Sequence, residues 1–333
     1  MPYQPDADLA DFIARIPKTE THLHLEGAID WRLINEVAPE VMPGQPRSWA
    51  DDFKYKSFAE FEDEIVDPGS AYFTSAERYH EAAKSVFKRC AEDNVKYVET
   101  SFHSGMIAWQ NLSAAEVVDA ILDAAPEGME VRVYTGMLRT DQTPEVVNAL
   151  EDLIKVEKLW GIDLHGPEQP PIQEWTPVYF RRAVDAGKRI KAHAGEFGPS
   201  AWVTDALDKL GVKRIEHGVR SIEDPAVVQR LADEDITLDV CPISNIKLDV
   251  FPTMKDHPIR KLSEAGVRCT INTDDPLIFG NTLNEEYAAI SMDLGCTRAE
   301  LLQFALNGWE IAECSGAFKQ PFVDQIAAMQ AAL

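Results

Sequence analysis

Eight short apolar runs, separated by segments of helical periodicity, constrain the fold of this chain more than any other feature. Each run is rich in aliphatic or β-branched residues and is short enough for a buried strand. The runs are Thr19–Leu25, Val95–Phe102, Val131–Met137, Trp160–Leu164, Ile190–Ala194, Arg214–Gly218, Ile236–Val240 and Val267–Asn272. Eight strands that alternate with helices over 333 residues predict a (β/α)8 TIM-type barrel, with residues 1–333 as a single domain. An open doubly wound sheet fits less well, because no Gly-x-Gly-x-x-Gly follows an early strand.

The segments between these runs carry helix signals. From Tyr79 to Cys90, apolar residues recur at i, i+3, i+4 and i+7, which is typical of a helix with one buried face. Thr297 and Glu300 fit a capping box, in which each side chain satisfies a backbone N–H of the first turn. The alternation is therefore one of strands and helices rather than of strands and irregular loops.

One long segment does not fit a tight loop between a strand and its helix. Residues Ala38 to Tyr72 hold four prolines and several aromatic side chains, among them Trp49, Phe58 and Phe61. We expect this segment to be an insertion after the first strand that lies over the mouth of the barrel.

Charge and cysteine content narrow the class of partner. Lys and Arg number 32 against 56 Asp and Glu, a net charge of −24, which argues against nucleic acid or an anionic membrane as a partner. No apolar stretch is long enough to span a membrane, and the polar, acidic N-terminus does not resemble a secretion signal. The five scattered cysteines contain no Cys-x-x-Cys pair, so we expect a reduced, cytoplasmic protein. Its oligomeric state does not follow from the sequence.

Polar residues follow several of the predicted strands. In a barrel of this kind the carboxyl ends of the strands meet at one rim, where active sites lie. Taken alone, each of these residues has an ordinary structural explanation, such as a buried histidine or a helix cap. Together, three or four imidazoles and a carboxylate at one rim fit a hydrolytic zinc site that takes a small-molecule substrate. The residues in question are His22, His24, Gly166, His193, Glu196, His217, Asp274 and Asp275.

The ordered set of motifs resembles the adenosine/adenine deaminase family of the amidohydrolase superfamily, from about Ile16 to the end of the chain. Each motif is weak by itself, but their order is highly specific. The motifs are Pro17-Lys18-Thr19-Glu20-Thr21-His22-Leu23-His24-Leu25-Glu26-Gly27, Gly161-Ile162-Asp163-Leu164, His193-Ala194-Gly195-Glu196, Ile215-Glu216-His217-Gly218 and Asn272-Thr273-Asp274-Asp275-Pro276.

The resemblance implies a role for each site residue in removing the 6-amino group of a purine. It implies that one Zn²⁺ per chain is bound by His22, His24, His193 and Asp274. It implies that Glu196 protonates N1 of the purine, and that His217, with Asp274, guides the attacking water. It also implies substrate contacts from His24, Glu26, the backbone N–H of Gly166 (to N3) and Asp275 (to N7).

The resemblance leaves the substrate open. Adenosine or 2′-deoxyadenosine, converted to inosine or its deoxy form in purine salvage, is the first expectation, and Gly161-Ile162-Asp163-Leu164 is similar to the nucleoside branch. Adenine, or a modified adenine nucleoside, is the alternative, because Glu26 and the segment Cys241–Leu248 resemble the branch that acts on the free base. His165 and Glu216 depart from the small residues expected at their positions.

Three rival functions fit the residues less well. A lactonase or phosphotriesterase would carry a metal-bridging lysine after the fourth strand, where this chain has His165. A cytidine-type deaminase would carry Pro-Cys-x-x-Cys, which is missing. A binding protein that had lost catalysis would be expected to have a broken ligand set, and this set is complete.

Overall fold

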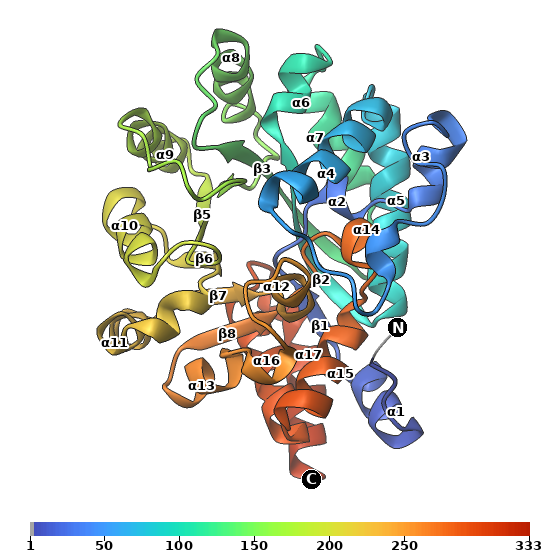
Figure 1. Ribbon diagram of the computed structural model, residues 1–333, viewed down its shortest axis with the longest axis vertical. Helices are drawn as coiled ribbons and strands as arrows, with labels where there is room; N and C mark the ends of the chain where they lie inside the picture. Colours follow the sequence, from blue (N-terminus) through green and yellow to red (C-terminus); the bar gives the residue numbers. More distant parts are fainter. Residues whose placement is uncertain (1–2) are drawn as a thin grey trace.

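The computed structural model describes residues 3–333, which contain eight parallel strands in a nearly closed barrel (Figure 1). Each strand pairs with the next one in the sequence, so the order around the sheet is the order along the chain. The strands are β1 (Lys18–Glu20), β2 (Val95–His103), β3 (Glu130–Leu138), β4 (Gly161–His165), β5 (Arg189–Ala194), β6 (Arg214–His217), β7 (Thr237–Val240) and β8 (Arg268–Ile271). The predicted (β/α)8 architecture is confirmed, and most strand ends lie within one residue of the prediction.

The first strand is the exception. The sequence predicts a strand over Thr19–Leu25, but β1 ends at Glu20 and a short helix begins at Leu25. Beyond β1 the chain pairs only at isolated positions, Leu23 with Asp274 and His24 with Ser101. These contacts close the barrel, because the N–H of His24 donates to the carbonyl of Asp274 (3.1 Å) and the N–H of Asp274 donates to that of His22 (3.1 Å). The two predicted metal-site segments are thus joined through their backbones.

Helices surround the barrel and occupy the segments between its strands (Figure 1). The predicted stripe of α5 is buried from Tyr79 to Phe87, and the capping box of Thr297 and Glu300 is present. None of the helices within residues 3–333 is both long and apolar enough to cross a bilayer. The helices are α1 (Ala7–Arg15), α2 (Leu25–Ala28), α3 (Trp31–Val37), η1 (Arg47–Trp49), α4 (Phe58–Tyr72), α5 (Ala76–Glu92), α6 (Ser104–Trp109), α7 (Ala114–Asp123), α8 (Pro144–Leu153), α9 (Trp175–Asp185), α10 (Ser200–Leu210), η2 (Val219–Glu223), α11 (Pro225–Asp233), α12 (Pro242–Lys247), η3 (Met254–Asp256), α13 (Ile259–Glu264), α14 (Pro276–Phe279), α15 (Leu283–Leu294), α16 (Arg298–Ile311) and α17 (Gly316–Ala331).

The segment after β1 that was predicted as an insertion contains η1 and α4. Ser57 caps α4 by accepting a hydrogen bond from the N–H of Glu60 (3.2 Å). The first turns of α4 turn Phe58 and Phe61 toward a cavity at the carboxyl ends of the strands, as expected for a segment that covers the barrel mouth. Phe61 also stacks on Phe279 of α14, with ring centroids 5.5 Å apart, which fixes α4 to the helix that follows β8.

Candidate active site

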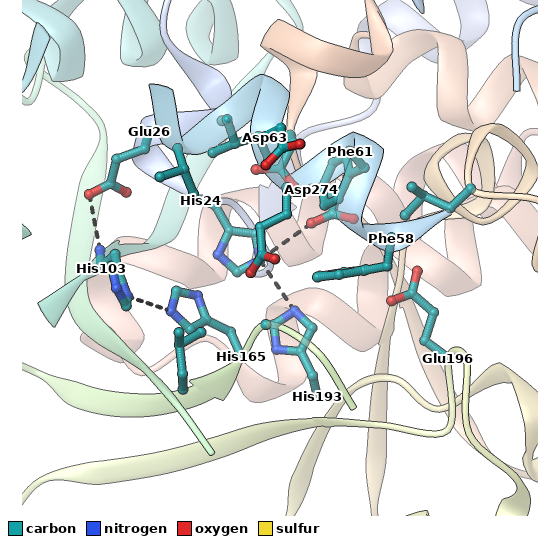
Figure 2. Close-up of a pocket in the computed structure, with 18 of the residues that line it drawn as sticks. His24, Glu26, Phe58, Phe61, Asp63, His103, His165, His193, Glu196 and Asp274 are labelled. Carbon is teal, nitrogen blue, oxygen red and sulfur yellow. Dashed lines mark hydrogen bonds and ion pairs between the residues drawn. The ribbon is translucent and has the colours of Figure 1, made fainter. Parts of the chain in front are cut away.

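A cavity of about 380 Å³ opens at the carboxyl ends of the barrel strands. Side chains from α4 form part of its wall (Figure 2). All but one of the site residues predicted from the sequence line this cavity. The exception is His22, which is fully buried next to it. The residues that do line it are His24, Glu26, Gly166, His193, Glu196, His217, Asp274 and Asp275.

Three imidazoles and one carboxylate meet at the floor of the cavity. His24 Nε2 lies 3.3 Å from His22 Nε2 and 3.2 Å from His193 Nε2. Asp274 Oδ1 lies 3.4 Å from His22 Nε2 and 3.3 Å from His24 Nε2. Ligands 2.0–2.1 Å from a tetrahedral Zn²⁺ are separated by about 3.3 Å. These four distances match that separation, so the four atoms are compatible with one metal ion bound between them. A second grouping, in which His217 takes the place of His24, also lies close enough to hold a metal.

Each of the three histidines is held from behind through its other ring nitrogen. Nδ1 of His22 lies 3.0 Å from the carbonyl oxygen of Asp239, and Nδ1 of His24 lies 2.9 Å from Ser101 Oγ. Nδ1 of His193 lies 3.0 Å from Glu216 Oε2. Partners at Nδ1 fix the orientation of a metal-binding histidine and leave the Nε2 lone pair for the metal. The contacts at Nδ1 thus favour the same set of ligands as the distances between the Nε2 and Oδ1 atoms.

Glu216 contacts His193 on the side away from the cavity and is paired with Lys191, which was not among the residues predicted for the site. Lys191 Nζ lies 2.9 Å from Glu216 Oε1, and both side chains are almost completely buried inside the barrel. A buried carboxylate without a cation would be costly, so Lys191 allows Glu216 to remain charged against His193. The sequence did carry a signal, since Lys191 and His193 are two residues apart on β5 and therefore share a face.

His217 and Asp274 adopt left-handed backbone conformations, with φ of 61° and 65°. Such values are uncommon for residues other than glycine and are maintained only where the surrounding structure enforces them. Asp274 is held by its backbone contacts to the first strand segment and by Ser244, whose hydroxyl donates to Asp274 Oδ2 at 2.7 Å. The backbone at the ends of β6 and β8 thus turns both side chains into the site.

Glu196 lies next to His217 on the cavity wall, with its Oε2 3.5 Å from His217 Nε2. Asn245 Nδ2 donates to Glu196 Oε1 (3.0 Å) and lies 3.2 Å from Nδ1 of His217, so one amide positions both side chains. Burial, with further contributions from Asp274 and Glu168, raises the pKa of Glu196 well above its ordinary value. The carboxyl group is therefore suited to carry a proton at neutral pH. Asn245 was missed as a functional residue, although it lies in the segment whose family resemblance was noted.

Asp275 depends on a glycine for its place in the cavity. A Cβ added to Gly27 would lie 1.6 Å from Asp275 Oδ1, so only glycine at that position leaves room for the carboxylate. Gly166, at the end of β4, has a φ of 77° and turns the chain at the cavity wall. The need for glycine at position 27 thus joins the first motif of the chain, which contains Gly27, to the last one, which contains Asp275.

Glu26 is directed into the protein on the side of the cavity away from Glu196 (Figure 2). Its Oε1 accepts hydrogen bonds from the backbone N–H of His103 (3.0 Å) and from the hydroxyl of Tyr79 (3.3 Å). Only 6% of the residue is exposed, and burial raises the pKa of Glu26 to about 7. His103 in turn lies beside His165, with Nδ1 of the first 3.0 Å from Nε2 of the second. His165 departs from the small residue that the family resemblance leads one to expect at its position, and the sequence indicates no role for His103.

The chain matches known proteins over nearly its whole length. A family described as adenosine deaminase matches residues 17–329. An adenine deaminase of Cupriavidus necator is 32% identical over 330 residues, which cover 96% of this chain and 94% of that protein. The crystal structure of an adenine deaminase from Arthrobacter aurescens aligns with a TM-score of 0.84 at 27% identity and covers 94% of this chain and 99% of that one. An amidohydrolase from Burkholderia ambifaria, solved with bound Zn, aligns with a TM-score of 0.83 at 26% identity, covering 100% of this chain and 97% of that one.

These matches extend across the barrel, the segment after β1 and every motif that contributes to the cavity. The chain therefore belongs to the adenosine deaminase family, and it is a purine aminohydrolase that acts on a carbon–nitrogen bond.

Proposed function

We propose that this enzyme hydrolyses the 6-amino group of free adenine, giving hypoxanthine and ammonia, with one zinc ion in its site. The observation that carries the choice of adenine is the position of Glu26. Its Oε1 already accepts hydrogen bonds from the His103 N–H and the Tyr79 hydroxyl, which holds the carboxylate against β2 and α5 and leaves only Oε2 for a ribose hydroxyl. Relatives named adenine deaminase support the same choice over adenosine, the first expectation from the sequence.

In the proposed reaction the metal would be held by His22, His24, His193 and Asp274, since four of the distances between their ligand atoms match those of a tetrahedral site. When bound, the zinc ion would lower the pKa of a water toward neutrality and so supply a nucleophile for C6 of the purine. The protein's own groups then handle the protons and orient the ring. Water adds at C6, the bond from C6 to the amino nitrogen breaks, and ammonia leaves.

Glu196 and His217 are the proposed proton carriers. Glu196 gives a proton to N1, which makes C6 electrophilic, and its raised pKa favours the protonated form that this step needs. His217, 3.7 Å from Asp274 Oδ2, takes one proton from the attacking water and passes it to the departing amino group. The remaining hydroxyl proton of the adduct returns to Glu196 as the C6–O double bond forms. Asp275 would bond N7 and the N–H of Gly166 would bond N3, so that the ring is held at both ends.

The charge of the cavity argues for an unphosphorylated purine. Among the described residues that line it, none is Lys or Arg, whereas Glu62 and Asp63 add negative charge away from the metal site. A phosphate group would enter such a cavity with no cation to pair with and with carboxylates nearby, which is costly. A neutral base meets no such penalty.

Ammonia release from a panel of purines tests the proposed function. For the zinc-loaded enzyme we expect kcat/KM for adenine to exceed that for adenosine and 2′-deoxyadenosine by at least about 100-fold, because the Glu26 carboxylate is held by His103 and Tyr79 instead of facing a ribose. AMP should be deaminated more slowly still. If adenosine is used as well as adenine or better, then the substrate assignment is wrong and the first expectation from the sequence stands.

A further inference from the structure

We propose that His165, positioned by His103, recognises the N9–H group of a free purine and so selects against purines substituted at N9. This inference rests on the proposed function, because it concerns how the same cavity distinguishes a base from a nucleoside. His165 was noted in the sequence only as a departure from the family, and none of the roles assigned to the metal site or to Glu196 uses it.

The two imidazoles form a hydrogen-bonded pair on the cavity wall. His103 ends β2 and His165 ends β4, and both rings line the cavity. Their hydrogen bond, 3.0 Å from Nδ1 of His103 to Nε2 of His165, sets the two rings beside the metal ligands, with His165 between His103 and His193 (Figure 2). Histidines at the ends of two nonadjacent strands are thus brought together at the substrate.

Two glycines make room for the pair. A Cβ on Gly136 would lie 2.3 Å from Cε1 of His165, and a Cβ on Gly105 would lie 2.4 Å from Nε2 of His103. Contacts this short do not occur for real side chains, so alanine at either position would displace an imidazole. Glycine on both β3 and α6 is therefore needed to keep these rings in place, as expected for side chains that recognise a ligand.

The hydrogen bond between the two rings determines which nitrogen of His165 is available. Nδ1 of His103 is the ring nitrogen that faces His165, 3.0 Å from its Nε2. Burial lowers the pKa of His103 to about 4, so the ring is neutral and carries one proton. In the proposed arrangement Nε2 of His165 carries the proton of this hydrogen bond and Nδ1 of His103 accepts it. Neutral His165 is then left with a bare Nδ1, for which no protein hydrogen bond is found among residues 3–333.

A bare Nδ1 at this place matches one feature of the free base. With N3 at the N–H of Gly166, the next nitrogen along the purine is N9, since N3 and N9 are bonded to the same carbon. His165 immediately precedes Gly166 in the sequence. In adenine, N9 carries a hydrogen that Nδ1 can accept, whereas in a nucleoside it carries a carbon. Sites that hydrogen-bond a substrate N–H discriminate strongly against analogues that lack it, because the protein acceptor is left unpaired.

The test compares adenine with 9-methyladenine, which loses the N9 hydrogen but adds only one methyl group. The wild-type enzyme should prefer adenine by at least about 100-fold in kcat/KM. His165→Ala should lower kcat/KM for adenine about 10- to 100-fold, mainly through KM, and should raise that for 9-methyladenine, so that the preference collapses. His165→Asn, whose amide oxygen can occupy the position of Nδ1, should restore part of the preference.

Three controls make the result specific. His103→Ala should change the preference in the same direction but less, since this residue acts through His165. His80→Ala removes an imidazole from α5, outside the cavity, and should leave the preference unchanged. Zinc content should stay the same in all variants, which separates recognition from damage to the metal site.

The inference is overturned if His165→Ala keeps the wild-type ratio or lowers both substrates equally. Failure of the proposed function looks different, because it would appear in the wild-type enzyme as a preference for adenosine over adenine. An enzyme that prefers adenine and whose preference does not depend on His165 would leave the function intact and remove only this inference.

Discussion

Replacing His193 with alanine is expected to cost the enzyme its metal and to lower kcat/KM for adenine by at least about 10⁴-fold. The physical reason is that His193 Nε2 is one of four converging ligand atoms, 3.2 Å from that of His24. Three remaining ligands bind zinc more weakly, and without it no nucleophile is available at neutral pH. Metal analysis of the purified variant, together with ammonia release, measures both effects.

The matched control for this prediction is His80→Ala on α5, which removes an imidazole of the same size from outside the cavity. That variant should retain wild-type zinc and activity. A His193→Ala enzyme that keeps one zinc per chain and normal turnover would contradict the ligand assignment. Circular dichroism and the thermal midpoint of the variant would show whether a loss of activity reflects unfolding instead.

Replacing Glu196 with glutamine is expected to leave zinc bound but to lower kcat about 10²- to 10⁴-fold. Glutamine preserves the shape of the side chain and can still face Asn245 and His217, but it cannot deliver a proton to N1. Because the lost interaction develops as the proton is transferred, kcat should fall much more than KM changes. Steady-state kinetics with adenine and metal analysis on the same preparation measure these quantities.

A comparison with Glu157→Gln, at an exposed position, accounts for any general effect of removing one negative charge from this acidic protein. Near-normal turnover of the Glu196→Gln enzyme would exclude Glu196 as the proton donor. Loss of zinc from that variant would instead place Glu196 among the groups that maintain the metal site.

The barrel could be predicted because its evidence is local. Alternating apolar runs and helix caps are properties of short segments, and in a parallel barrel the carboxyl ends of all strands lie on one rim. It was therefore possible to expect His193 and Asp274 near one another without knowing any contact between them. The prediction failed for Thr19–Leu25, where the chain leaves the regular ladder after Glu20 so that His22 and Asp274 can meet through the backbone.

The rest of the site depends on contacts that no short segment reveals. The Glu26 carboxylate accepts a hydrogen bond from the N–H of His103, so the acidic side chain whose position suggested a contact to ribose is held by another strand. Gly27 is required by Asp275, at the other end of the chain. The pairing of Lys191 with Glu216 arises only in the folded barrel, where inward-pointing side chains of the neighbouring strands β5 and β6 lie side by side.

The most direct test of a one-zinc purine deaminase is a zinc titration of chelator-treated enzyme, followed by the rate of ammonia release from adenine. We predict no activity in the metal-free protein, a linear rise as zinc is added, and a plateau at one zinc per chain, because His22, His24, His193 and Asp274 provide one set of four ligand atoms. Activity in the metal-free protein, or a plateau only at two zinc ions per chain, would contradict the account.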